Sequence, residues 1–208
     1  MNVIFDIGNV LIKWEPKNAF RHAFASDAQI DSFFAEIGFF DWNLAQDCGR
    51  SRDEGVAVIA EKWPHYRDLI DGYFDRFGDV VSERIEESWT ILKELQSGGV
   101  RLFALTNWAK DTWPIGLAKH PDLQNLFEDI VVSGLENVLK PERRIFDLLC
   151  SRNQIDQHDC LFIDDSATNV KGAIASGMQA HHFTSAAVLR ADLIKRGLLS
   201  ATITSPIR

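Results

Sequence analysis

Short apolar runs, each about the length of a β-strand, recur along most of the chain. The first covers residues 2–6 and stops at Gly8 and Asn9, as a buried strand does before a tight loop. Four more runs of this kind follow, at 100–106, 129–133, 160–164 and 179–183. Segments with helical spacing separate the later runs, near 111–119, 141–153 and 168–176. Alternating strands and helices predict a parallel sheet with right-handed crossovers, and therefore an α/β fold with a Rossmann-like, doubly wound sheet.

The segment between residues 15 and 81 has a different pattern. No strand-length run occurs in it, and its aromatic residues recur at helical spacings; they are Phe20, Phe24, Phe33, Phe34, Phe39, Phe40, Trp42 and Trp63. This pattern predicts several short helices inserted directly after the first strand. The expected organisation is a core made of residues 1–14 and 82–208, with residues 15–81 as a helical insertion.

A further helix is predicted where the chain returns to the core, over residues 82–97. Its apolar residues repeat every three or four positions, and Ser82 stands where an N-cap is expected. The pair Gly98-Gly99 ends the pattern, as glycine does at many helix C-termini.

Composition narrows the classes of function. Hydrophobic residues make up 46% and charged residues 25% of the 208 positions, which is typical of a globular protein with a packed core. The net charge of −8 argues against a nucleic-acid or acidic-membrane partner, because such proteins usually present a basic face. The longest apolar runs are only strand-length and the three cysteines lack any CxxC spacing, so we expect a cytoplasmic protein without a membrane segment or signal peptide.

Polar side chains stand at the ends of three of the expected strands and directly before the helix expected at 141–153. They are Asp6, Thr106 with Asn107, Lys140, and Asp164 with Asp165. In doubly wound sheets ligands bind beyond the carboxyl ends of the strands, so these positions are where chemistry is expected. Taken singly, most have an ordinary explanation as a turn former, a helix cap or a solvated lysine. The adjacent carboxylates Asp164 and Asp165 are less ordinary, because their repulsion at a buried edge favours a bound cation.

The series as a whole resembles the haloacid dehalogenase-like hydrolase superfamily. VIFDIGNVL, LFALTN, VLKPERRIF and LFIDDSATN are similar to its four motifs, in the same order and at the same strand ends, and GAIASG is similar to the helix that follows the fourth motif. The resemblance covers nearly the whole chain. It implies that residues 15–81 form the family's helical cap of the C1 type.

The resemblance also implies a role for each matching residue. Asp6 would be the nucleophile, which becomes covalently phosphorylated or alkylated, and Lys140 would be its catalytic partner. Thr106, Asn107 and Lys140 would bind the transferring phosphate group. A carboxylate can attack a phosphate anion only if positive charge and hydrogen-bond donors bring the two together.

A Mg²⁺ cofactor follows from the same resemblance. Its ligands would be Asp6, the main-chain carbonyl of Gly8, and Asp165, together with water and substrate oxygens. Asp164 and Asn169 would stabilise this site without binding the ion directly. Asp164 would form an ion pair with Lys140, and Asn169 would hold a metal-bound water.

One position departs from the family pattern. Most phosphatases of the superfamily carry a second Asp two residues after the nucleophile, where it protonates the leaving oxygen, and Gly8 stands at that position here. The sequence FDIGNVL is similar to bacterial sugar-phosphate phosphatases, acting on α-D-glucose 1-phosphate, that tolerate Gly there. We therefore expect a Mg²⁺-dependent phosphatase for a small phosphomonoester, with a sugar phosphate as the expected substrate. Two alternatives stay open, a metal-independent 2-haloacid dehalogenase and a catalytically inactive binding module.

The insertion is expected to select the substrate. Four residues lie where related caps place a substrate-recognition segment: Trp42, Asn43, Asp47 and Arg50. Asp47 is a candidate to replace the missing acid. Trp108 and Trp113 could line the pocket or pack on the sheet edge. The sequence is compatible with a monomer or a homodimer.

Overall fold

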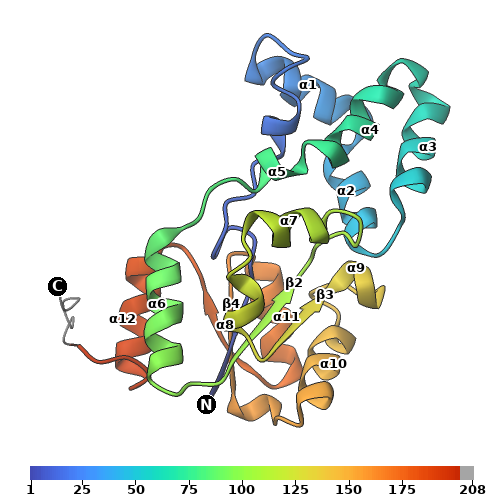
Figure 1. Cartoon of the computed structure of the whole chain (residues 1–208). Helices are drawn as coiled ribbons and strands as arrows, with labels where there is room; N and C mark the ends of the chain where they lie inside the picture. The colour runs from blue at the N-terminus through green and yellow to red at the C-terminus, as the bar shows by residue number, and fades with distance from the viewer. Residues whose placement is uncertain (202–208) are drawn as a thin grey trace.

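A five-stranded parallel sheet forms the centre of the protein in the computed structural model, which describes residues 1–201 (Figure 1). The strands are β1 (Asn2–Phe5), β2 (Leu102–Thr106), β3 (Asp129–Val132), β4 (Cys160–Asp164) and β5 (Gln179–His182). Their order in the sheet is β3-β2-β1-β4-β5, and every neighbouring pair is parallel. The predicted α/β class and doubly wound sheet are confirmed.

Helices cover both faces of this sheet, because successive residues of a buried strand point to opposite sides. One face packs against α6 (Glu86–Ser97) and α12 (Ala186–Lys195), and its apolar residues include Val3, Phe5, Leu102, Ala104, Leu161 and Ile163. The other face packs against α10 (Arg143–Asn153) and α11 (Ala167–Ser176), and includes Ile4, Phe103, Leu105 and Phe162. The short helices α7 (Trp113–Lys119), α8 (Leu123–Leu126) and α9 (Ser133–Glu136) connect β2, β3 and α10.

The start of α6 differs from the sequence prediction. The helix begins at Glu86, its N-cap position is Ile85, and no side chain caps it, so the prediction of Ser82 as the N-cap is wrong. Residues 82–85 instead run alongside the chain that leaves β1: Ile85 N–H donates to the Leu11 carbonyl at 2.8 Å, and Arg84 pairs with Ile12 in an antiparallel bridge. These main-chain hydrogen bonds compete with the helical turn that Ser82 would begin.

The segment after β1 is helical, as predicted. It contains α1 (Asp27–Ile37), α2 (Phe39–Asp47), α3 (Arg52–Lys62), α4 (Arg67–Asp75) and α5 (Phe77–Val80), with 3₁₀ turns at Pro16–Ala19 and Pro64–Tyr66. Aromatic packing holds these helices together: the Phe20 ring lies 5.3 to 5.8 Å from the rings of Phe33, Phe34, Phe39 and Tyr73. Figure 1 shows the group at the end of the sheet toward which the strands run. Among the described residues no helix combines the length and the apolarity needed to cross a membrane.

Candidate active site

The register of the sheet brings the carboxyl ends of β1 and β4 together. Phe5 pairs with Ile163, and the Asp6 N–H donates to the Ile163 carbonyl at 2.8 Å, so Asp6 lies beside Asp164. Oxygens of Asp6, Asp164 and Asp165 lie within 4.8 Å of one another. The sheet therefore gathers three carboxylates that are far apart in sequence.

Lys140 supplies the positive charge of this cluster. Its Nζ lies 2.9 Å from Asp6 Oδ1 and 2.7 Å from Asp164 Oδ2, and its side chain is fully buried. Asn107 holds the Lys140 main chain from both sides: Asn107 Oδ1 accepts from the Lys140 N–H at 2.9 Å, and Asn107 Nδ2 donates to the Lys140 carbonyl at 3.1 Å. A residue after β2 thus fixes the lysine that faces the end of β1.

Asp164 is saturated with hydrogen-bond donors. Its Oδ1 accepts from the Ser166 N–H at 2.7 Å, its Oδ2 accepts from Lys140 Nζ, and Asn169 Nδ2 lies 3.2 Å from both oxygens. Because its lone pairs are used in this way, Asp164 is arranged to position Lys140 rather than to bind a ligand. Asn169 serves that same arrangement, since its amide points at Asp164.

Burial and mutual repulsion set the electrostatics. Burial, with contributions from Asp164 and Asp165, raises the pKa of Asp6 to about 8, against the opposing effect of Lys140. Burial alone would lower the pKa of Lys140, but Asp6 and Asp164 raise it, so the lysine stays charged. Burial and Asp164 also raise the pKa of Asp165. Three carboxylates share one ammonium, so a hard divalent cation with a preference for oxygen ligands fits the donor set.

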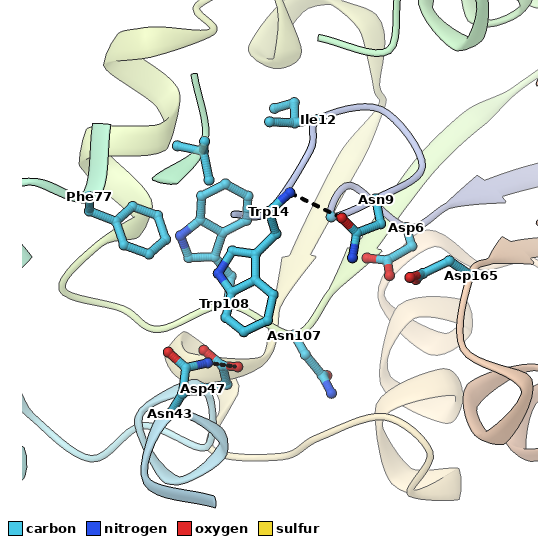
Figure 2. A pocket seen from close by; sticks show the side chains of 12 residues that line it. Asp6, Asn9, Ile12, Trp14, Asn43, Asp47, Phe77, Asn107, Trp108 and Asp165 are labelled. Carbon is cyan, nitrogen blue, oxygen red and sulfur yellow. Dashed lines mark hydrogen bonds between the residues drawn. The ribbon is translucent and has the colours of Figure 1, made fainter. Parts of the chain in front are cut away.

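A cavity of about 150 Å³ opens in front of Asp6. Asp6, Asp165 and Asn107 form one polar side of it, and Figure 2 shows these side chains at its edge. The remaining wall is largely apolar and is formed by Ile12, Trp14, Phe77, Val81 and Trp108, with Asn43 and Asp47 from α2. The cavity therefore combines the carboxylate cluster with aromatic surface.

The loop after β1 shapes the entrance to the cluster. Asn9 adopts a left-handed conformation with φ of 54°, which asparagine tolerates better than most residues. Its N–H donates to the Ile12 carbonyl at 2.7 Å, and its Oδ1 accepts from the Trp14 N–H at 3.0 Å. Asn9 and Trp14 were not among the site residues predicted from the sequence. The Gly8-Asn9 pair after the strand indicated a tight loop at this point, but not which side chains line the cavity.

The candidate substrate residues of the insertion lie in different places. Trp42 is 4% exposed and its indole N–H donates to the Gly55 carbonyl at 2.9 Å, inside the aromatic core of the helices. Arg50 donates to the Trp42 carbonyl at 2.8 Å. Neither belongs to the wall of the cavity, whereas Asp47 does. Asn43, one helical turn before Asp47 and expected from the sequence in the same segment, also lines the cavity.

Of the remaining predicted residues, some line the cavity and others lie behind its wall. Thr106, the last residue of β2, is 1% exposed, and neither it nor Lys140 belongs to the cavity wall. Trp108 lines the cavity and packs closely on Gly116 of α7, where an added Cβ would lie 2.5 Å from the ring. Trp113 stacks edgewise on Trp108 with ring centroids 5.3 Å apart and lies outside the wall.

Comparison with known proteins identifies the family. Residues 1–177 match the haloacid dehalogenase-like hydrolases over most of the chain, so this protein belongs to that family and is a hydrolase.

Two curated relatives come from fungi. The chain is 28% identical to the sesquiterpene phosphatase astK of Aspergillus oryzae, over 70% of this chain and 84% of the relative. It is 23% identical to the drimenol cyclase drtB of Aspergillus calidoustus over 86% of this chain, but spans only 33% of that relative.

Solved structures share the fold at low identity. The HAD-family enzyme BT-2542 of Bacteroides thetaiotaomicron superposes with a TM-score of 0.69 at 19% identity, covering 88% of this chain and 93% of that one. The L-2-haloacid dehalogenase of Xanthobacter autotrophicus superposes with a TM-score of 0.63 at 16% identity, covering 93% and 82%. The fold alone therefore does not choose between the two reactions.

Proposed function

We propose that this protein is a Mg²⁺-dependent phosphatase that hydrolyses a small phosphomonoester through a phospho-Asp6 intermediate. The observation that carries the proposal is the cluster of Asp6, Asp164 and Asp165 around a single buried Lys140. A metal-independent dehalogenase has no use for Asp165, because Asp164 already positions Lys140 and a halide leaves without a metal ion or a proton. An inactive binding module has no need of a buried carboxylate and lysine held 2.9 Å apart.

Asp6 is oriented for attack before any substrate binds. Its Oδ1 accepts from the Ile7 N–H at 2.7 Å and from Lys140 Nζ at 2.9 Å. Two donors on one oxygen fix the plane of the carboxylate, and a fixed nucleophile lowers the entropic cost of reaching the transition state. Attack on phosphorus would break the ester bond and leave the phosphate on Asp6.

The proposed phosphate-binding residues have hydrogen-bond donors left for a phosphate group. An ammonium has three N–H bonds, and Lys140 uses two of them on Asp6 and Asp164, so one remains for a phosphoryl oxygen. Asn107 uses one amide N–H on the Lys140 carbonyl and retains the other at the cavity wall. Thr106 is the third proposed donor, at the end of β2 beneath them.

The proposed metal ligands are Asp6, Asp165 and the carbonyl of Gly8, which all line the cavity. Bound there, Mg²⁺ would supply the positive charge that allows both carboxylates to ionise and that offsets the charge of the phosphate. The family neighbour BT-2542 has been solved in complex with magnesium and inorganic phosphate, and the relative astK is named as a phosphatase, which supports this proposal.

The organic part of the substrate is proposed to be a small alcohol with an apolar face. Trp14, Phe77 and Trp108 offer aromatic surface, whereas a sugar would need hydrogen-bond partners for several hydroxyls. A cavity of about 150 Å³ can hold a group about the size of benzene. The sugar phosphate expected from the sequence stays a prediction, which the experiment below compares directly. Residues 15–81, as the proposed cap, supply Asn43, Asp47 and Phe77 to this choice.

The experiment measures product release from four compounds, each with Mg²⁺ and with a chelator. They are p-nitrophenyl phosphate, benzyl phosphate, α-D-glucose 1-phosphate and 2-chloropropionate. We expect phosphate release that stops in chelator and in Asp6→Asn, with kcat/KM highest for the aromatic esters. Chloride release that ignores the chelator would establish the dehalogenase instead, and no release from any compound would support the binding module.

A further inference from the structure

A phosphatase that acts on the ester of a weakly acidic alcohol needs a proton at the leaving oxygen, and Gly8 cannot supply one. In an in-line displacement the nucleophile and the leaving oxygen stand on opposite sides of phosphorus. With Asp6 attacking from the sheet, the leaving oxygen points away from the strand ends, toward the wall of the cavity that the helical insertion forms. A proton donor must therefore stand on that wall.

Asp47 stands there. It is the last residue of α2 and lines the cavity, and Figure 2 shows it with Asn43 on the side opposite Asp6 and Asp165. The other insertion residues of the wall, Asn43, Phe77 and Val81, have no proton to give at neutral pH. Asp47 is thus the titratable group that faces Asp6 across the cavity.

A chain of hydrogen bonds fixes the Asp47 carboxyl. Asn43 Nδ2 donates to Asp47 Oδ2 at 3.0 Å, and Tyr73 Oη on α4 donates to Asn43 Oδ1 at 3.1 Å. Tyr73 is 1% exposed, so the chain begins inside the aromatic core and ends at the cavity. This chain fixes one of the two oxygens of a carboxyl group that belongs to the cavity wall.

The main chain at Asp47 is tied to the core as well. Ser133 Oγ at the start of α9 donates to the Asp47 carbonyl at 2.6 Å and accepts from the Trp108 N–H at 2.9 Å. Trp108 directly follows Asn107 at the end of β2. These hydrogen bonds therefore fix the position of the end of α2 relative to the carboxyl ends of the strands, where Asp6 lies.

We propose that Asp47 is the proton-transfer residue that replaces the acid missing at Gly8; this inference rests on the proposed phosphatase function. As the bond between Asp6 and phosphorus forms and the ester bond breaks, the Asp47 carboxyl gives its proton to the leaving oxygen and becomes a carboxylate. Water then attacks phosphorus, Asp47 takes one of its protons, and the bond from Asp6 to phosphorus breaks. Both carboxyl groups return to their starting states.

The surroundings of Asp47 suit both halves of this cycle. Burial raises its pKa to about 7, while the Ala109 N–H and the charge of Lys140 oppose that rise. Tyr73, whose hydroxyl donates to Asn43, stays neutral because burial and Asp47 raise its pKa. Asp47 also ends α2, where the helix dipole disfavours a negative charge. A donor that titrates near neutral pH serves equally as acid and as base.

The test is Asp47→Asn, which keeps the shape and the acceptor for Asn43 but cannot exchange a proton. We expect turnover of benzyl phosphate to fall by about 10²- to 10⁴-fold, because benzyl alcohol is a weak acid and its oxygen needs the proton. Phosphorylation of Asp6 by p-nitrophenyl phosphate should fall by less than about tenfold, since nitrophenolate leaves unaided. The second step still lacks its base, so a burst of nitrophenol should appear before slow turnover.

The matched control is Asp41→Asn, which removes a carboxylate from the exposed face of the same helix and should behave as the parent. Equal losses in the rate at which the two esters phosphorylate Asp6, or turnover of benzyl phosphate within tenfold of the parent, would overturn the role of Asp47. Tyr73→Phe adds a positioning test, because it should lower kcat for benzyl phosphate more than for p-nitrophenyl phosphate. If the parent protein hydrolyses neither ester, the phosphatase function itself fails, and this result differs from an unaffected variant of an active parent.

Discussion

Lys140 Nζ lies 2.7 Å from Asp164 Oδ2, and neither side chain has any exposure to solvent. The pair joins the loop before α10 to the end of β4 and points the same ammonium at Asp6. A buried charge that loses a partner is costly, because little water can reach it. The ion pair that prepares the nucleophile is therefore also a structural requirement.

We predict that Asp164→Ala lowers the free energy of unfolding by about 3 kcal/mol, since Asp6 remains as the only partner of Lys140. The control is Glu128→Ala, which breaks an exposed ion pair with Arg101 and should cost less than about 1 kcal/mol. Urea denaturation measures both. A loss at Asp164 no larger than the loss at Glu128 would show that the buried pair does not stabilise the fold.

The second prediction concerns the metal. Asp165 is repelled by Asp164 in the absence of a cation, so Asp165→Asn should raise the melting temperature of metal-free protein. Mg²⁺ at 100 times its dissociation constant should stabilise the parent by about 2.7 kcal/mol and the variant by much less. Thermal melts with Mg²⁺ and with chelator measure this, and Asp159→Asn at the exposed opposite end of β4 is the control. Equal Mg²⁺ stabilisation of parent and Asp165→Asn would place the ion elsewhere.

Much of the sheet edge could be predicted from sequence because strand ends are encoded locally. Apolar runs stop at Asp6, Thr106 and Asp164, and parallel pairing brings such ends together without further information. The start of α6 could not be predicted in this way. Whether Ser82 caps a helix depends on the competing main-chain hydrogen bonds to the segment after β1, which sequence spacing does not show.

The sequence indicated the α2 segment, but not which of its side chains line the cavity. Asn43 and Asp47 are four residues apart and share one helical face, whereas Trp42 belongs to the face packed among aromatic rings. Which face meets the sheet depends on how α2 packs against α4 and α9. The sequence therefore indicates the segment that holds Asn43 and Asp47, but does not separate these two residues from Trp42 and Arg50, which lie outside the cavity wall.

A third prediction uses the protonation of Asp47. Its pKa of about 7 exceeds the ordinary value of 3.8, so the folded state holds the proton more tightly than the unfolded state does. Between these two values Asp47 makes stability fall as pH rises, by up to about 1.4 kcal/mol per pH unit. Asp47→Asn should therefore lose less stability than the parent from pH 4 to pH 7, and Asp41→Asn should follow the parent. Parallel curves for parent and Asp47→Asn would contradict a raised pKa.

A fourth prediction concerns the aromatic wall. A Cβ at position 116 would lie 2.5 Å from the Trp108 ring, so Gly116→Ala should push the indole into the cavity. We expect KM for benzyl phosphate to rise about tenfold or more, while inorganic phosphate still inhibits as in the parent. Gly78→Ala is the control, because its added Cβ would meet only Ile115 at 3.8 Å. An unchanged KM in Gly116→Ala would mean that Trp108 does not contact the organic group.

The last prediction returns an acid to position 8. A side chain fits there, because the backbone of Gly8 is not left-handed and no atom lies within 4 Å of an added Cβ. Gly8→Asp should therefore fold normally, with an unchanged circular dichroism spectrum. In the Asp47→Asn background it should restore turnover of benzyl phosphate by about tenfold or more, since a carboxyl at either position can protonate the leaving oxygen.

The comparison of substrates makes that rescue specific. Turnover of p-nitrophenyl phosphate in the first step should change little, because its leaving group does not need the proton. A rescue of equal size for both esters would mean that the carboxyl introduced by Gly8→Asp acts on the metal site or the loop. A well-folded double variant with no rescue would mean that the leaving oxygen lies beyond the reach of position 8, and that Gly8 reflects a substrate bound closer to the helices than in phosphatases that carry the second Asp.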